Sequence, residues 1–149
     1  MTATRAPEVV LSTVSSDSHT WNLIFLELLL TETGYRVHNL GACVPDNLLL
    51  GACRTLRPDL LVLSSVNGHG GMDGQRAIRR LRGTPGLDTL PAVIGGKLGT
   101  DGEAGVDARR ARLIAAGFDA VFEGQDAVAN FRTFARGLRT AAPALDVLR

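Results

Sequence analysis

The chain has 149 residues, of which 45% are hydrophobic, and its formal net charge is +1. This length suits one core, so we expect a single domain over 1–149 with flexible ends at 1–7 and 141–149. The balanced charge, with only short arginine clusters, argues against nucleic acid as a partner. No apolar run reaches the ~20 residues that span a bilayer, and the two cysteines form no CxxC motif. We therefore expect a cytoplasmic protein with no membrane partner.

Five strand-like segments alternate with five helix-like segments along the chain. Short apolar or β-branched runs predict strands at 9–14, 35–40, 60–66, 92–96 and 119–123. The segments between and after them predict helices at 20–33, 46–56, 73–82, 107–116 and 126–139. Gly34 and Gly117 follow two of these helices, where a left-handed cap favours glycine.

This alternation predicts an α/β fold. We expect a flavodoxin-like, doubly wound, five-stranded parallel sheet with helices on both faces. The third strand, "LLVLSSV", is apolar at consecutive rather than alternate positions, which is typical of a strand buried on both faces. It is therefore predicted to be central.

Ligands of such sheets bind outside the carboxyl ends of the strands, where the strand order reverses. The five loops at that edge are "SSDSHTWN" (15–22), "GACVPD" (41–46), "SSVNGHGG" (64–71), "GGKLG" (95–99) and "EGQD" (123–126). Their glycines let a backbone approach a large ligand, and their serines can hydrogen-bond it without filling its space. The loop set favours a ligand over a series of plain turns, although the last loop receives no assignment.

Asp17 and His19 stand two residues apart in the first loop, so in extended backbone their side chains point the same way. A carboxylate there can hold the proton of one ring nitrogen and leave the lone pair of the other for a metal. His38 and His69 belong to other elements, so a zinc site with several protein ligands is not expected. A lone imidazole suits a metal that arrives inside a macrocycle. The alternative is that Asp17 or Ser18 caps the first helix and His19 is a surface residue.

"DSHTWN" (17–22) resembles the DxHxxG signature of cobalamin-binding domains, and "SSV" (64–66) and "GG" (95–96) resemble their second and third elements. More narrowly, the stretch from Val9 to about Phe122 is similar to the small, cobalamin-binding subunit of glutamate mutase (methylaspartate mutase). Three segments carry this closer match: "ETGYRVHNLG", "PDLLVLSSVNGHGGMDG" and "AAGFDAVFEG". Asn22 replaces the final glycine of the signature, and Ile24 stands where such subunits often have lysine.

The resemblance implies that His19 replaces the dimethylbenzimidazole tail of the cofactor as the lower axial ligand of cobalt, and that Asp17 hydrogen-bonds His19. It also implies that the detached tail enters a slot beside the sheet, along Ser64 and Val66, with Gly95 and Gly96 near its nucleotide end. The cofactor-binding residues expected in full are Ser16, Asp17, Ser18, His19, Thr20, Trp21, Asn22, Ser64, Ser65, Val66, Gly68, His69, Gly70, Gly95, Gly96, Lys97, Gly117 and Phe118.

The same resemblance implies adenosylcobalamin as the cofactor and an isomerase as the enzyme. The cofactor supplies a radical by cobalt–carbon homolysis, and a separate, larger barrel subunit binds the amino-acid substrate. The reaction would interconvert glutamate and 3-methylaspartate, the chain would contribute no catalytic residue of its own, and it would be inactive alone.

Other functions remain open. The hydroxyl-rich first loop could cradle the phosphate of FMN, although Asp17 would repel it. A cobalamin carrier for methyl transfer and a cobalamin-dependent sensor share the signature. A receiver domain shares the sheet but needs an aspartate where Ser64 and Ser65 stand. Near the site, Trp21 could pack on the edge of a corrin or be buried in the core, of which we favour burial, and we expect Cys43 to be buried. His69 could approach the cofactor but is expected to face solvent, and His38, away from the site, is expected to be structural.

Overall fold

The computed structural model describes residues 5–147, with side chains up to Arg139. Its sheet has the strand order β2-β1-β3-β4-β5, and all neighbouring strands are parallel. The strands are β1 (Glu8–Ser12), β2 (Arg36–Asn39), β3 (Leu60–Ser65), β4 (Ala92–Gly96) and β5 (Ala120–Phe122). The helices are α1 (Trp21–Thr33), α2 (Asp46–Leu56), α3 (Gly70–Arg82), α4 (Val106–Ala116) and α5 (Ala127–Val147), with a short 3₁₀ turn at Gly102–Gly105.

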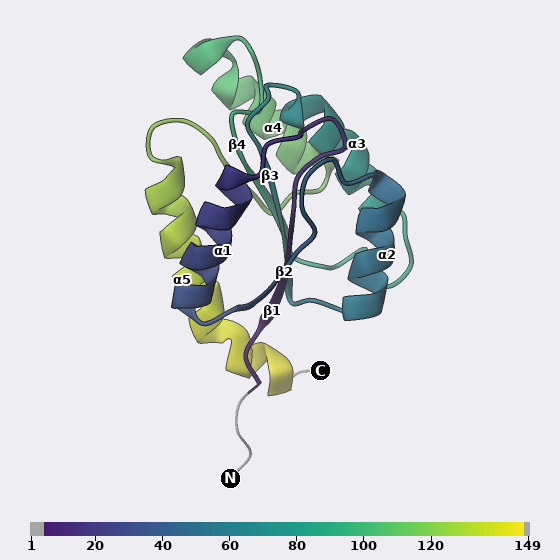
Figure 1. Cartoon of the computed structure of the whole chain (residues 1–149). Helices are drawn as coiled ribbons and strands as arrows, with labels where there is room; N and C mark the ends of the chain where they lie inside the picture. The colour runs from purple at the N-terminus through teal and green to yellow at the C-terminus, as the bar shows by residue number, and fades with distance from the viewer. Residues whose placement is uncertain (1–4, 148–149) are drawn as a thin grey trace.

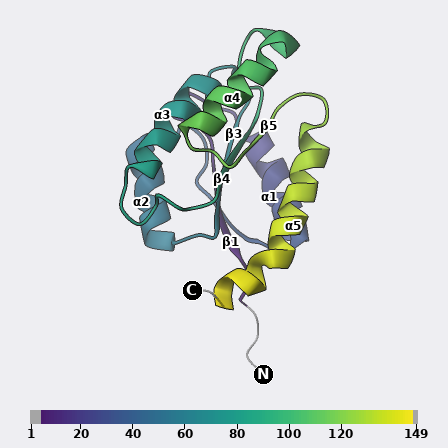
Figure 2. The same cartoon turned by 180° about the vertical axis from the view of Figure 1, so that it is seen from behind.

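Two helical layers enclose the sheet. Helices α1 and α5 cover one face, and α2, α3 and α4 cover the other (Figures 1 and 2). Alternate residues of a strand serve opposite layers: Leu11 and Val62 pack toward α1 and α5, whereas Val10 and Leu61 pack toward α2 and α3. All six residues of β3 are buried. The predicted doubly wound sheet with a central third strand is therefore confirmed.

All ten predicted elements occur, with small shifts at their ends. α3 begins at Gly70, three residues earlier than predicted, because His69 already serves as its N-cap. α5 extends to Val147, so the backbone of 141–147 is helical, whereas the sequence predicted a helix that ends at 139. Residues 1–4 and 148–149 of the expected flexible ends lie outside the described residues. Within 5–147, no helix combines the length and the apolarity that a membrane crossing demands.

The carboxyl ends of the strands meet at one edge of the sheet, opposite the chain termini (Figure 1). At that edge β1 leads into α1 on one face, while its neighbour β3 leads into α3 on the other face. The strand order reverses at this point, which is where sheets of this kind bind their ligands. Gly34 ends α1 with a left-handed φ of 106°, and its amide reaches the carbonyls of Leu30 and Thr31, as the sequence predicts.

Candidate functional site

Asp17 is fully buried in the loop after β1, and its carboxylate accepts four hydrogen bonds. One oxygen, Oδ1, lies 2.9 Å from the backbone N and 2.6 Å from Nδ1 of His19. The other, Oδ2, accepts the Ser65 hydroxyl and the Val66 amide, both at 2.8 Å. Helix α1 starts only at Trp21, and its N-cap is Thr20 without a capping side-chain bond. The alternative that Asp17 or Ser18 caps this helix is therefore wrong.

The charge of the Asp17 carboxylate fixes the tautomer of the His19 imidazole. Burial raises the pKa of Asp17, but the hydrogen bonds from the amides of His19 and Val66, and from the side chains of His19 and Ser65, outweigh it and lower the pKa to about 2. An ionised carboxylate only accepts hydrogen bonds, so in the neutral imidazole the proton sits on Nδ1 and Nε2 keeps its lone pair. The His19 side chain is 47% exposed. It therefore presents Nε2 at the surface.

A groove of about 370 Å³ lies between the sheet and helices α1 and α5. The sequence predicted part of its lining, namely Trp21, Asn22, Ser64, Val66, Gly95 and Gly96. It missed the apolar walls, which include Phe25, Leu26, Val62, Val93, Phe122 and Phe131. Val66 connects the groove with the Asp17–His19 pair: the residue lines the groove, and its amide donates a hydrogen bond to Asp17.

Asn22, which lines this groove, carries an unsatisfied polar atom. Its Nδ2 donates to Ser64 Oγ at 2.9 Å, but its buried Oδ1 has no hydrogen-bond partner among the described residues. A buried acceptor without a partner is costly, and such atoms commonly mark a place where a ligand donates. Although Asn22 departs from the cobalamin signature, it sits where a donor from a bound molecule would be expected.

The glycines predicted to line the cofactor have a structural reason as well. Gly96 has a φ of +118°, and a side chain there would clash with the carbonyl oxygen of Ser65. A Cβ on Gly95 would lie 2.8 Å from the carbonyl oxygen of Phe122, and one on Gly70 would lie 2.7 Å from Ser65 Cβ. Close packing at the strand ends thus requires these glycines, and the open groove beside Gly95 and Gly96 is a second result of their small size.

The remaining predicted site residues lie at opposite ends of the sheet. Ser16, Ser18, Thr20, His69 and Lys97 are exposed at the carboxyl edge, and Gly68 turns there with a φ of +86°. Gly117 and Phe118 are not at this edge. They precede β5 at the opposite end of the sheet, where Arg82 donates to the Gly117 carbonyl and Phe118 is buried in the core beside α3. Their assignment to the cofactor site is corrected accordingly.

Two other expectations also fail. Trp21 is 67% exposed rather than buried, because it lies with Ile24 and Leu28 on the outer face of α1. Cys43 is exposed rather than buried. His69 is exposed as expected, and His38 lies 2.9 Å from a Glu8 carboxylate oxygen, in keeping with a structural role. No group of three or more His, Cys, Asp and Glu side chains in the described part of the chain could hold a metal ion.

No model of a protein family matches the chain. It is 34% identical to a glutamate mutase sigma subunit of Halobacterium salinarum over 80% of this chain and 78% of that protein. It is also 29% identical to the glutamate mutase sigma subunit of Fusobacterium nucleatum over 78% and 84% of the two chains. The monomethylamine corrinoid protein of Methanosarcina barkeri has the same fold, with a TM-score of 0.66 at 18% identity over 94% of this chain and 57% of that chain. The chain therefore belongs to the family of glutamate mutase sigma subunits.

Proposed function

We propose that the chain is the cobalamin-binding subunit of a carbon-skeleton mutase, with adenosylcobalamin as its cofactor and His19 as the lower axial ligand of cobalt. The buried Asp17 carboxylate carries this proposal, because it fixes the proton on Nδ1 of His19 and leaves Nε2 for a metal. The name of the corrinoid neighbour supports the same ligand class, and the names of the sigma-subunit relatives support a mutase.

The groove fits the detached nucleotide arm of such a cofactor. Its walls are mostly apolar and aromatic, which suits a flat benzimidazole, and it opens beside the loop that carries His19. The orphaned Oδ1 of Asn22 can accept from a hydroxyl or amide of the arm, while Ser64 holds the Asn22 amide in place. The residues present therefore fit the group that the family implies.

When bound, adenosylcobalamin supplies an organic radical through homolysis of its cobalt–carbon bond. The chain's own residues bind and orient: His19 ligates, Asp17 holds the imidazole, and the groove retains the arm. Substrate binding then belongs to a larger, barrel-type subunit, with glutamate and 3-methylaspartate as the pair interconverted in the cytoplasm. The chain alone is inactive in this proposal.

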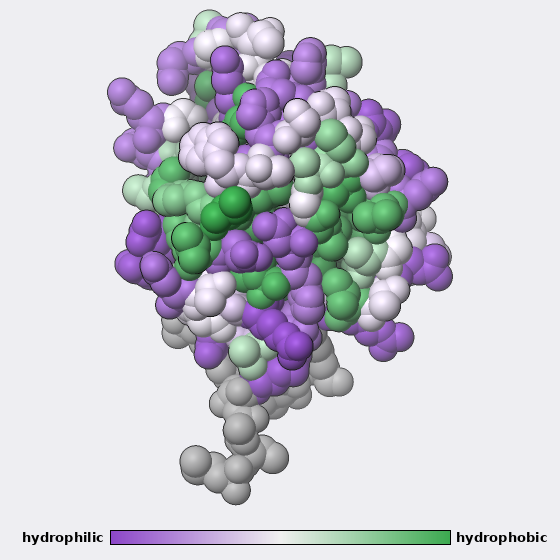
Figure 3. All heavy atoms as spheres, in the orientation of Figure 1, coloured by the Kyte–Doolittle hydropathy of each residue, from purple (hydrophilic) through white to green (hydrophobic). Residues whose placement is uncertain are grey.

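An exposed apolar face of α1 supports the proposal of a partner subunit. This outer face consists of Trp21, Ile24, Phe25 and Leu28. These side chains are exposed although they are large and apolar, while the inner face of the same helix is buried in the core. Figure 3 shows the apolar surface over α1. A helix that is apolar on all its faces is typically buried on all of them. The face begins at Trp21, which also lines the groove, so the larger subunit could cover both together.

Electron paramagnetic resonance tests the ligand directly. Uniformly ¹⁵N-labelled protein is loaded with unlabelled cob(II)alamin, whose cobalt lines are split into triplets by an axial ¹⁴N and into doublets by an axial ¹⁵N. We expect doublets from the wild type and from His38→Gln, which alters a histidine of β2 away from the site. His19→Ala should abolish them. Triplets from labelled wild-type protein would refute the role of His19, because the nitrogen would then belong to the cofactor.

A further inference from the structure

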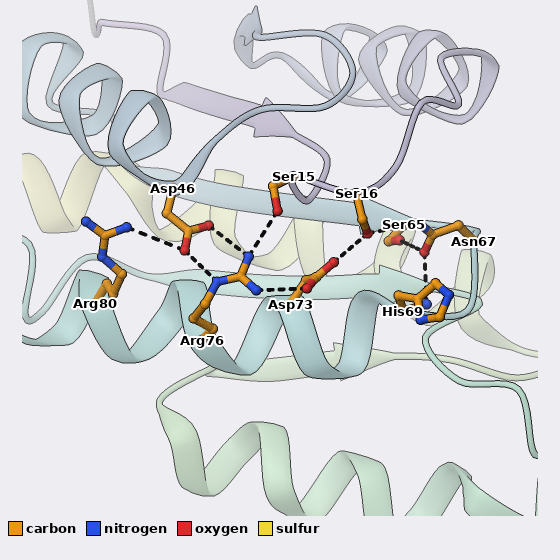
Figure 4. A network of polar contacts seen from close by, with 9 residues as sticks. All are labelled: Ser15, Ser16, Asp46, Ser65, Asn67, His69, Asp73, Arg76 and Arg80. Carbon is orange, nitrogen blue, oxygen red and sulfur yellow. Dashed lines mark hydrogen bonds and ion pairs between the residues drawn. The ribbon is translucent and has the colours of Figure 1, made fainter.

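Arg76, in the middle of α3, joins three segments of the chain (Figure 4). Its Nε lies 2.8 Å from Asp46 Oδ2 at the start of α2, and its Nη1 lies 2.8 Å from Asp73 Oδ1 on its own helix. Its Nη2 donates to the hydroxyl of Ser15 at 3.0 Å. The ion pair with Asp46 connects two helices, but the contact with Ser15 reaches the loop that carries Asp17.

A second contact from the same helix reaches the next residue of that loop. Ser16 donates its hydroxyl proton to Asp73 Oδ2 and accepts a hydrogen bond of 3.1 Å from Asn67 Nδ2. Asn67 in turn accepts the His69 amide at 2.9 Å. Two consecutive serines are thus tied to α3 and to the loop after β3 immediately before Asp17 (Figure 4).

We propose that Arg76 and Asp73 are positioning residues, which fix Ser15 and Ser16 and thereby hold Asp17 and His19 in the geometry that presents Nε2 to a metal. This inference rests on the proposed function. The loop needs such support because no capping side chain secures the start of α1. Around Asp17, the backbone is tied by its amide to Val14 and by its carbonyl to Cys43.

The position of the Asp17 carboxylate depends on the hydrogen bonds that hold Ser15 and Ser16. One of its oxygens binds His19 and the other binds the end of β3, so a small shift of the loop would strain bonds on both sides. A loop that samples several conformations binds a ligand more weakly, since only the competent fraction contributes. Arg76 and Asp73 therefore raise the affinity for the cofactor by ordering the loop, without touching the cofactor themselves.

Amide hydrogen exchange in the cofactor-free protein tests the proposal. The probes are the amides of Asp17 and His19, which both donate hydrogen bonds inside the loop. Arg76→Gln and Ser16→Ala should accelerate their exchange about tenfold, because local opening becomes easier. Arg79→Gln is the matched control: it removes an exposed arginine of the same helix and should leave the rates within about twofold. Ser16→Ala removes only an exposed hydroxyl, so it remains informative if Arg76→Gln folds poorly.

Cobalamin binding gives the second readout. We expect both variants to bind cob(II)alamin about fivefold more weakly, which is less than the ~10- to 100-fold typical of a residue that touches the ligating histidine. The ¹⁵N doublets should weaken in parallel. Wild-type exchange, affinity and doublets in both variants would refute the positioning role. If the labelled wild type shows triplets, the proposed function fails, while the exchange rates still decide whether Arg76 and Asp73 order the loop.

Discussion

Replacing Asp17 with asparagine tests the chemistry on which the site depends. The carboxylate accepts donors at both oxygens, including the backbone amides of His19 and Val66, which can only donate. An asparagine amide has one accepting oxygen and one donating nitrogen. In either orientation its nitrogen would face a partly buried backbone N–H, that of His19 or that of Val66, so Asp17→Asn loses a hydrogen bond and sets two donors against each other.

The magnitude follows from the pKa of the fully buried Asp17 carboxyl. This pKa is about 2 in the folded chain, against an ordinary value of 3.8, which corresponds to about 2.5 kcal/mol of stabilisation at 1.36 kcal/mol for each pKa unit. Because the folded pKa is depressed, this stabilisation is fully present above pH 3.8 and is lost as the pH falls toward about 2. At pH 3 about half of it remains.

Urea denaturation at two pH values provides the assay. At pH 7, Asp17→Asn should lower the free energy of unfolding by about 2–4 kcal/mol. At about pH 3 the difference from wild type should shrink by about 1 kcal/mol, because the wild-type carboxylate is then partly protonated on unfolding. Asp88→Asn, at an exposed aspartate, should differ little from wild type at either pH. A difference between Asp17→Asn and wild type that is constant or larger at the lower pH would refute the reasoning.

Three further substitutions probe the groove, the loops and the outer face of α1. Gly96→Ala should destabilise the chain by about 3 kcal/mol in urea, because of its positive φ and the clash with β3, whereas Gly137→Ala meets open space and should not. Arg109→Met should cost about 3 kcal/mol in the same assay, because it leaves the Glu123 carboxylate, 7% exposed, without its ion-pair partner. Leu28→Ser should change stability by no more than about 0.5 kcal/mol but weaken association with the proposed larger subunit in sedimentation experiments.

The sequence was sufficient for the fold and for the centre of the site. Short apolar runs alternating with helical segments specify the sheet, and "LLVLSSV" marks the central strand because both its faces are buried. The Asp17–His19 spacing anticipates the contact between Asp17 Oδ1 and His19 Nδ1. Both are local patterns, so they can be read without knowledge of distant contacts.

What the sequence could not provide depends on tertiary placement. Phe131 lines the groove because α5 packs beside α1, a neighbour relation that no local pattern encodes. The exposure of Trp21 was missed, and the periodicity of α1 does not identify its outward side because the helix is apolar on both faces. Phe118 follows a helix and precedes a strand, which places it at the amino edge however well its segment resembles the family. The role of Arg76 was not predicted, because its contact with Ser15 joins segments 61 residues apart.

The end of β3 couples the two halves of the site. Successive residues of a strand face opposite sides of the sheet, so Ser64 binds Asn22 at the groove while Ser65 binds Asp17 beside His19. Val66 then contributes its amide to Asp17 and lines the groove. Any displacement of this strand end by a molecule in the groove would move the acceptor that orients the imidazole. Occupation of the groove and orientation of His19 are therefore expected to depend on each other, and a variant that fills the groove should alter the proposed ligation of cobalt by His19 although it touches neither Asp17 nor His19.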